Sequence, residues 1–344
     1  MKKFINNCSF DDLSAFIVSC GEKPYRVSQI HEWIYKKYVQ NWEDMTNIPR
    51  GLQTKIKERY NLYSLTFKKA VSSKKDDAIK YLFETIDKHA IETVFIKKGK
   101  RRTICLSTQI GCKYKCSFCA SGMAGFIRDL DVAEIVDQLF LVQNYAREKI
   151  TNIVFMGIGE PFDNYENTVQ AIKIFNNEKG VAVGARRITV STVGLIPAIE
   201  RFAKEGFSQV RLSISLHAAL ADKRKKMMPA AKKYPLKDLI TSLKKVRQKF
   251  KKAITLEYIL IKNVNDTIHD ARALVCIAKE LKAKVNIIGY NALGNDESNV
   301  PHKNDIDLFR AQLEKSNICT TIRYSAGADI SAACGQLRLR EAAV

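Results

Sequence analysis

Three closely spaced cysteines are the residues of this sequence with the most distinctive chemistry. Cys112, Cys116 and Cys119 form a C-x3-C-x2-C pattern with Phe118 directly before the last cysteine. Three thiolates on one tight loop suit one face of an iron–sulfur cube. They leave one iron without a protein ligand, and catalysis at a metal needs such an open position. A three-cysteine zinc site with a distant fourth ligand, or unrelated thiols, are the alternatives.

The overall composition narrows the class of protein and of partner. The 344 residues carry 57 Lys+Arg against 36 Asp+Glu, a formal net charge of +21, and 46% of them are hydrophobic. That apolar content excludes a disordered chain, and no apolar run approaches the roughly 20 residues of a membrane span. The charge predicts a polyanionic partner, with nucleic acid favoured over anionic lipid.

Cysteine usage and the N-terminus predict a cytoplasmic protein. The sequence has nine cysteines, an odd number, and begins MKKFINNC without an apolar signal core. A disulfide framework is therefore not expected, and clustered cysteines are better explained as metal ligands or chemical groups.

Strand and helix patterns alternate from residue 103 onward, which predicts an α/β fold built on a parallel sheet, open or closed into a partial barrel. The expected strands are 103–107, 152–156, 187–191, 210–216, 255–261 and 284–290. The expected helices are 131–147, 165–176, 196–205, 235–250, 267–282 and 304–315. In such sheets the functional site lies at the carboxyl ends of the strands. The cysteine loop follows the first strand, and the turn 157–161 (GIGEP) follows the second.

The first hundred residues have a different pattern. Residues 1–60 predict short helices, residues 62–98 predict strands, and the basic run 97–102 predicts a turn between two strands. This turn is either a solvated hairpin tip or a phosphate contact. Basic residues that could position a nucleic acid are Lys36, Lys37, Arg50, Lys55, Lys57 and Arg59, with possible extensions at 223–226 and 244–252.

The cysteine spacing resembles the signature of the radical S-adenosylmethionine (SAM) superfamily. This resemblance implies one [4Fe-4S] cluster, held by Cys112, Cys116 and Cys119, whose open iron binds SAM. The 157–161 turn resembles the superfamily motif that holds the SAM amino group. The SAM-binding residues implied in this way are Gly159, Glu160, Ser191, Ser215, Leu216, His217 and Asn291.

The rest of the chain resembles one family of this superfamily, the RlmN/Cfr RNA adenine methyltransferases. The resemblance covers nearly all of residues 1–340 and rests on Cys105 and the segments 92–94 (ETV), 155–161 (FMGIGEP), 215–218 (SLHA), 264–266 (VND) and 330–337 (ISAACGQL). It implies a partial (β/α)6 barrel with a small helical RNA-binding domain. The expected divisions are 1–60 (RNA-binding helices), 61–102 (β-rich connection), 103–325 (barrel) and 326–344 (C-terminal segment).

The resemblance also implies the reaction and the catalytic residues. Adenine C2 is electron-poor, so the family uses two SAM molecules: one methylates Cys334, and the other generates a radical on this S-methyl group. The methylene radical adds to the base, Glu92 removes the ring proton, and Cys105 forms a disulfide with Cys334 to release the product. The implied substrates are adenine-2503 of 23S rRNA and adenine-37 of tRNA, with a flavodoxin- or ferredoxin-type electron donor and a monomeric enzyme.

Several alternatives stay open at this point. The antibiotic-resistance branch methylates C8 of the same rRNA adenine, but Pro161 is typical of the C2 branch. Gly289 and Ala292 stand where the C2 branch usually has prolines around Asn291. A non-catalytic, metal-bearing RNA-binding protein predicts no role for Cys334 beyond stability. A radical SAM enzyme acting on a small molecule or protein leaves the charge unexplained.

Overall fold

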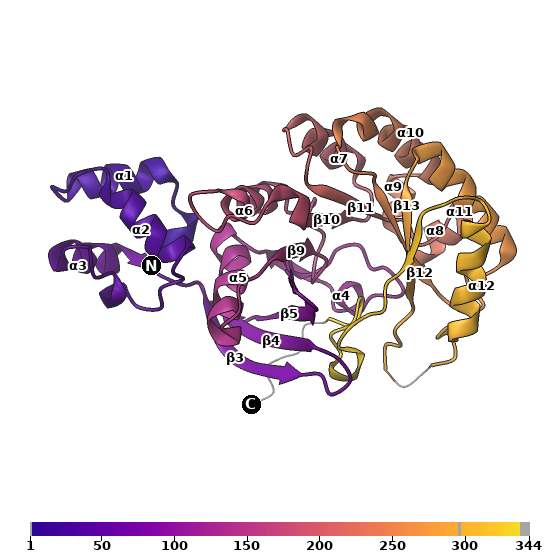
Figure 1. Cartoon of the computed structure of the whole chain (residues 1–344), viewed down its shortest axis with the longest axis horizontal. Coiled ribbons are helices and arrows are strands. Elements are labelled where there is room, and N and C mark those ends of the chain that lie inside the picture. The colour runs from indigo at the N-terminus through magenta and orange to yellow at the C-terminus, as the bar shows by residue number, and fades with distance from the viewer. Residues whose placement is uncertain (1, 295–296, 338–344) are drawn as a thin grey trace.

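A computed structural model describes residues 2–294 and 297–337, and its centre is one curved, ten-stranded sheet (Figure 1). The strand order is β14-β13-β12-β11-β10-β9-β6-β5-β4-β3. From β14 to β6 every neighbouring pair is parallel, whereas β3 to β6 form an antiparallel meander. The strands are β3 (Leu65–Ser72), β4 (Ala78–Thr85), β5 (Ala90–Lys98), β6 (Arg101–Cys105), β9 (Asn152–Phe155), β10 (Ile188–Thr192), β11 (Arg211–Ser215), β12 (Thr255–Leu260), β13 (Lys284–Gly289) and β14 (Thr320–Ile322).

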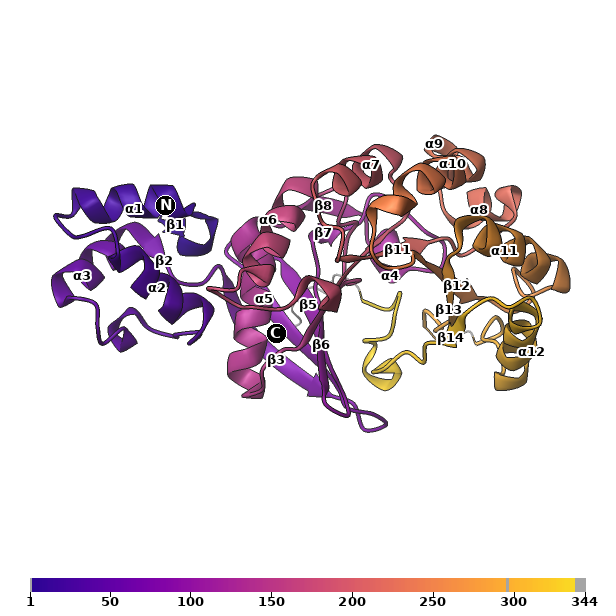
Figure 2. The same ribbon diagram turned by 45° about the horizontal axis from the view of Figure 1, so that its top comes forward.

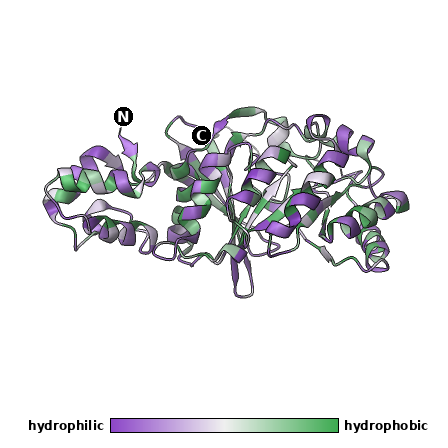
Figure 3. Cartoon of the chain, turned by 90° about the horizontal axis from the view of Figure 1, so that it is seen from above, coloured by the Kyte–Doolittle hydropathy of each residue, from purple (hydrophilic) through white to green (hydrophobic). Residues whose placement is uncertain are grey.

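Helices cover the outer side of the parallel strands, as the right-handed crossovers between parallel neighbours require. They are α5 (Val132–Ala146), α6 (Tyr165–Asn176), α7 (Ile196–Lys204), α8 (Ala221–Met227), α9 (Ala230–Lys233), α10 (Leu236–Val246), α11 (Ile268–Leu281) and α12 (Lys303–Glu314). Asp131 and Thr267 begin α5 and α11 with capping boxes. In Figure 3 hydrophobic residues gather where helices meet the sheet, and hydrophilic residues colour the outer helix turns.

The N-terminal part is a small helical unit beside the barrel (Figure 2). It contains α1 (Phe10–Ser19), α2 (Arg26–Tyr35) and α3 (Arg50–Arg59), closed by the pairing of β1 (Lys3–Phe4) with β2 (Tyr60–Asn61). Asp137 of α5 ties this unit to the barrel. Its carboxylate accepts hydrogen bonds from the Asn6 amide (2.7 Å) and from the Ser64 hydroxyl (2.6 Å) and backbone N–H (2.5 Å).

The predicted partial barrel with an N-terminal helical part is confirmed, and all six predicted strand–helix units are present within a few residues of their expected bounds. The segment 61–102 adds β3, β4 and β5 to the same sheet rather than standing apart from it. The sequence reasoning did not find β14, α8 or α9. No helix of the described residues is long and apolar enough to span a membrane.

Candidate active site

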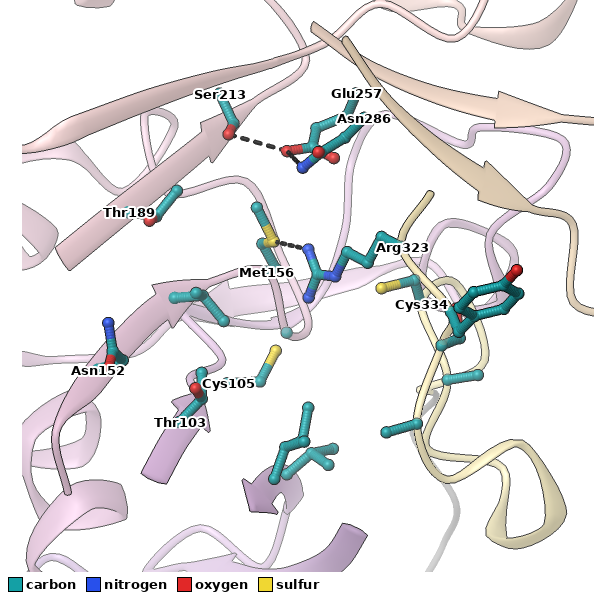
Figure 4. Close-up of a pocket in the computed structure, with 18 of the residues that line it drawn as sticks. Thr103, Cys105, Asn152, Met156, Thr189, Ser213, Glu257, Asn286, Arg323 and Cys334 are labelled. Atoms are coloured by element: carbon teal, nitrogen blue, oxygen red, sulfur yellow. Dashed lines mark hydrogen bonds between the residues drawn. The ribbon is translucent and has the colours of Figure 1, made fainter. Parts of the chain in front are cut away.

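The interior of the barrel holds a cavity of about 510 Å³, which we call the barrel cavity (Figure 4). Because side chains alternate along a strand, alternate residues of β5, β6, β9, β11 and β12 face this space. Most of these inward residues are polar or sulfur-containing rather than aliphatic, as a barrel that receives a ligand requires. They include Thr103, Cys105, Asn152, Met156, Thr189, Ser213, Glu257, Asn286 and Arg323.

A second, smaller cavity of about 140 Å³ adjoins the cysteine motif, and we call it the cluster pocket. Both cavities are lined by Cys119, Glu257, Arg323 and Cys334, so they share a wall. Nine of the thirteen predicted site residues line the cluster pocket: Cys112, Cys116, Cys119, Gly159, Glu160, Ser191, Ser215, His217 and Cys334. The structure thus brings together residues that are spread over more than 200 positions of the sequence.

The cysteine motif lies on a tightly folded loop between β7 (Gln109–Gly111) and the short helix α4 (Ala120–Met123). Gly111 has a φ of +79°, and a Cβ there would lie 1.9 Å from the Gly125 carbonyl oxygen, so the loop can close only on glycine. Cys112 donates its backbone N–H to that same oxygen at 2.7 Å. β8 (Phe126–Asp129) then pairs with β7 and completes the loop.

These three thiols fit an iron–sulfur cube. Among the described residues no three His, Cys, Asp or Glu side chains converge on a single metal position. A cube does not need such convergence, since each thiolate binds a different iron. Burial raises the pKa of Cys112 to about 12 and also raises that of Cys116. Binding of the metal therefore has to displace the thiol protons, as it does at thiolate sites in general.

Glu160 is buried, lines the cluster pocket and is fixed by backbone hydrogen bonds. Its Oε1 accepts the Phe162 N–H at 3.0 Å and its Oε2 accepts the Val193 N–H at 2.8 Å. Burial raises its pKa to about 7 despite these bonds. Gly159 has a φ of +101°, and a Cβ there would lie 2.5 Å from the Gln109 side chain. Two fixed carboxylate oxygens with free lone pairs suit the ammonium group that the SAM motif is expected to bind.

Ser191, Ser215 and His217 also line the cluster pocket. The two serine hydroxyls are 3.3 Å apart on the neighbouring strands β10 and β11, where Ser215 lies two residues beyond Ser213, the register partner of Ser191. His217 Nδ1 accepts the Ile259 N–H at 3.1 Å, and burial lowers the pKa of His217 to about 3, so the ring is neutral. Leu216 is buried and contacts this region through its backbone, whose N–H donates to the Glu257 carbonyl.

The C-terminal segment carries Cys334 into the space between the two cavities. The Asn291 amide donates to the Cys334 carbonyl (3.1 Å) and to the Ser325 hydroxyl (3.0 Å). The Gly335 carbonyl accepts the Ala120 N–H at 2.7 Å, which fastens Cys334 directly against the cysteine loop. Asn291, predicted to contact SAM, therefore holds the Cys334 loop in this structure.

Cys105 lies across the barrel cavity from Cys334 at the end of β6 (Figure 4). Burial raises its pKa to about 12, and the charge of Arg323 opposes this effect. All nine cysteines are free thiols, so the expected Cys105–Cys334 disulfide remains a prediction.

Glu92 is buried beneath the C-terminal segment. Its Oε1 forms an ion pair with Lys80 Nζ at 2.8 Å, and this ammonium also donates to the Ser331 carbonyl at 3.2 Å. Glu92 lies two positions before Val94, which lines the barrel cavity, so both side chains point to the same face of β5.

Two basic runs have mixed roles. Arg224, predicted to extend a nucleic-acid surface, is fully buried, and its guanidinium donates to the Val193 and Leu216 carbonyls, so that prediction is wrong for this residue. In the 97–102 turn Lys97 and Arg102 pair with Glu148. Lys98 and Arg101 of this turn line the barrel cavity, and they form its basic end together with Arg186, Arg187 and Arg211.

The sequence reasoning missed Glu257 and Arg323. Glu257 stands inside an apolar strand, TLEYIL, and a lone charge in a buried strand was the available signal. Arg323 follows a three-residue strand that was not predicted, so nothing marked its direction.

Comparison with known proteins agrees with this geometry. Residues 106–275 match the model of the radical SAM superfamily, and residues 5–62 match the ribosomal RNA large subunit methyltransferase N-terminal domain. A relative from Caldicellulosiruptor saccharolyticus, named "Probable dual-specificity RNA methyltransferase RlmN", is 42% identical over 99% of this chain and 98% of its own length. One with the same name from Clostridioides difficile is 40% identical over 98% of each chain.

A solved structure leads to the same family. The crystal structure of a radical SAM methyltransferase from Sphaerobacter thermophilus has a TM-score of 0.94 and 38% identity, and the match covers 98% of this chain and 99% of that one. Proteins of the radical SAM superfamily use a [4Fe-4S] cluster and SAM, and the cluster pocket has the donor groups for both. The chain belongs to the RlmN family of radical SAM RNA methyltransferases.

Proposed function

We propose that this enzyme methylates C2 of adenine-2503 in 23S rRNA and of adenine-37 in tRNA, with Cys334 as the carrier of the methyl group. The observation that carries the proposal is the position of Cys334. It lines both the cluster pocket and the barrel cavity, so one sulfur can face SAM on one side and a base on the other.

The residues of the chain have separate roles in this reaction. When bound, the cluster supplies the electron that cleaves SAM to a 5′-deoxyadenosyl radical. Cys334 Sγ accepts a methyl group from one SAM molecule, and the 5′-deoxyadenosyl radical from the second takes a hydrogen atom from it. The resulting methylene radical adds to the adenine ring carbon, and the adduct would return one electron to the oxidised cluster and give its ring proton to Glu92. The Cys105 thiolate then attacks Cys334 Sγ: the sulfur–carbon bond breaks, the released carbon takes up a proton to become the methyl group, and a disulfide forms that an external reductant must reduce before the next turnover.

Glu92 is the proposed acceptor of the ring proton. Its carboxylate is buried on the same face as Val94, under the segment that carries Cys334. The ion pair with Lys80 holds this carboxylate in place until the base arrives. Movement of the C-terminal segment that covers Glu92 would give the ring carbon access to this carboxylate.

The RNA would be positioned by residues 1–60 and by the basic end of the barrel cavity. The connection 61–102 then supplies Glu92, the barrel 103–325 supplies the cluster, SAM and Cys105 sites, and the segment 326–344 supplies Cys334. Because the adenine must leave its stack to reach Cys334, base flipping is part of the proposal. We expect a monomer that takes electrons from a flavodoxin- or ferredoxin-type donor in the cytoplasm.

The test is an anaerobic assay with reconstituted enzyme, methyl-labelled SAM, reductant and unmodified 23S rRNA or tRNA. Mass spectrometry of the digested RNA should detect 2-methyladenosine with the wild-type enzyme and none with Cys334→Ala. Detection of 8-methyladenosine would assign the enzyme to C8 chemistry. Formation of 5′-deoxyadenosine without either product would contradict the proposed substrate.

A further inference from the structure

Glu257 is a buried carboxylate whose hydrogen bonding is incomplete. Its side chain lies in the wall shared by the two cavities, and the residue is 2% exposed. Oε1 accepts from the Ser213 hydroxyl at 2.9 Å and from the Asn286 amide at 3.2 Å (Figure 4). Oε2 has no hydrogen-bond partner among the described residues. An unpaired buried oxygen of this kind costs free energy, so a ligand that donates to it is expected.

Arg323 supplies the complementary group in the same space. Its guanidinium lies near Cys334, Glu257 and Cys105. Among the described residues, this guanidinium donates to the Met156 thioether, a weak acceptor, at 2.8 Å. No ion pair joins the described side chains of Arg323 and Glu257, although both line the two cavities. An N–H donor and a carboxylate acceptor therefore face one cavity with a gap between them.

We propose that Glu257 and Arg323 read the edge of the flipped adenine: Glu257 Oε2 accepts the N6 amine, and Arg323 donates to the ring nitrogen beside the reacting carbon. This inference rests on the proposed function. A neutral base that presents one donor and one adjacent acceptor matches the pair, whereas guanine and inosine place an oxygen against the carboxylate. Flipped bases are commonly recognised through such edge contacts.

The position of Arg323 favours the RNA base over SAM as the ligand of this pair. The base must lie against Cys334 for carbon transfer, which is where Arg323 is. The polar groups around the cluster pocket, Glu160 and His217, are already fixed by backbone hydrogen bonds and are the better SAM contacts.

The experiment crosses two enzymes with two substrates. Holoenzyme, wild type or Glu257→Gln, is given an RNA fragment with either adenosine or purine riboside, which lacks the N6 amine, at the target position. In Glu257→Gln the Ser213 and Asn286 donors hold the amide oxygen, so the amide NH2 faces the cavity and opposes the adenine amine. Wild type should prefer adenosine by about 10- to 100-fold, the effect of one hydrogen bond to a charged group. The variant should lose most of this preference.

The control is Glu280→Gln on α11, the same change at a glutamate that forms an exposed ion pair with Lys244 of α10. This variant should keep the wild-type adenosine-to-purine ratio. Two measurements report on SAM alone: the mass of Cys334 after its methylation, and 5′-deoxyadenosine formation without RNA. Both should stay within about twofold of wild type in Glu257→Gln. An unchanged adenosine-to-purine ratio, or an equal loss of the two SAM-only reactions, overturns the inference. Failure of wild type to methylate adenosine contradicts the proposed function itself.

Discussion

Glu160 and Glu257 are buried glutamates on two sides of one connected space, and they differ in how their oxygens are satisfied. Backbone N–H groups of Phe162 and Val193 bind both oxygens of Glu160. Among the residues that the structure describes, side chains bind only one oxygen of Glu257. Burial raises the pKa of both carboxyl groups. The cluster pocket is therefore preorganised by the protein, whereas the barrel cavity leaves hydrogen-bond donors and acceptors available to a ligand.

This difference follows from what each side must bind. The Glu160 carboxylate, which is expected to bind the SAM ammonium group, is held by backbone donors that cannot swing away. The substrate base is expected to gain binding free energy from protein groups whose hydrogen bonding is incomplete until the base arrives. In the described part of the barrel cavity these groups are Glu257 Oε2 and the Arg323 guanidinium. Substitutions on the two sides should therefore fail in different assays.

Loss of Cys334, which borders both sides, should have the largest effect. Cys334→Ala should give no methyladenosine, because no other described cysteine lines both cavities except Cys119, which is assigned to the cluster. Cys105→Ala should instead accumulate a covalent protein–RNA adduct, since the step that breaks the carbon–sulfur bond is lost. Denaturing electrophoresis of labelled RNA separates these results. Cys276→Ala, in an exposed position of α11, is the matched control and should retain wild-type turnover.

A substitution at Glu160 should affect the SAM side alone. Glu160→Gln places an amide NH2 against one of two backbone donors, so SAM cleavage should fall by about 10- to 100-fold, as expected when a charged hydrogen bond is lost. The measurement is 5′-deoxyadenosine formed without RNA. The adenosine-to-purine ratio of the residual activity should stay as in wild type. If this ratio changed as much as in Glu257→Gln, the two sides would not be separable and the comparison would fail.

The Lys80–Glu92 pair tests a third arrangement, in which a side-chain cation holds the carboxylate. Lys80→Met should reduce RNA methylation by roughly 10-fold, because Glu92 loses its orientation and its partner charge. Lys80→Arg should restore most of the activity. Methylation of Cys334 by SAM should be unchanged in both variants. Equal loss of Cys334 methylation and RNA methylation would indicate general unfolding rather than positioning of Glu92.

The sequence pointed to more residues on the SAM side of the candidate site than on the substrate side, for a physical reason. Thiolate ligands and glycine turns have fixed local spacing, so Cys112 to Cys119 and Gly159 could be found in one stretch of chain. The six strand–helix units were equally visible, since each is a local hydrophobic pattern. Glu257 and Arg323 act only through their partners on other strands. The space between these two side chains depends on the order of the strands in the sheet and on the position of β14. No local sequence pattern predicts either of them.

The smallest effect is expected at Asp137, a buried carboxylate outside the active site whose oxygens are bound by protein groups alone. Burial raises its pKa from 3.8 to about 7, although Ser64 and Asn6 donate to it. The folded state therefore binds this proton more tightly than the unfolded state. The associated stability is complete below about pH 4 and is lost as the pH rises through about 7.

The free energy of unfolding in urea should consequently be lower for Asp137→Asn than for wild type at pH 5. This difference between the two proteins should be smaller at pH 8. The change is tolerable because Asn6 Oδ1 has no hydrogen-bond partner among the described residues and can accept from the new amide after a flip of Asn6. Asp137→Ala, which leaves the Ser64 and Asn6 donors unpaired, should cost at least about 1–3 kcal/mol, and its cost relative to wild type should also be larger at pH 5 than at pH 8. Neither variant should alter the adenosine-to-purine ratio, since a carboxylate satisfied entirely by protein has no oxygen to offer a ligand. A pH-independent difference between Asp137→Asn and wild type would show that burial does not control this carboxyl group.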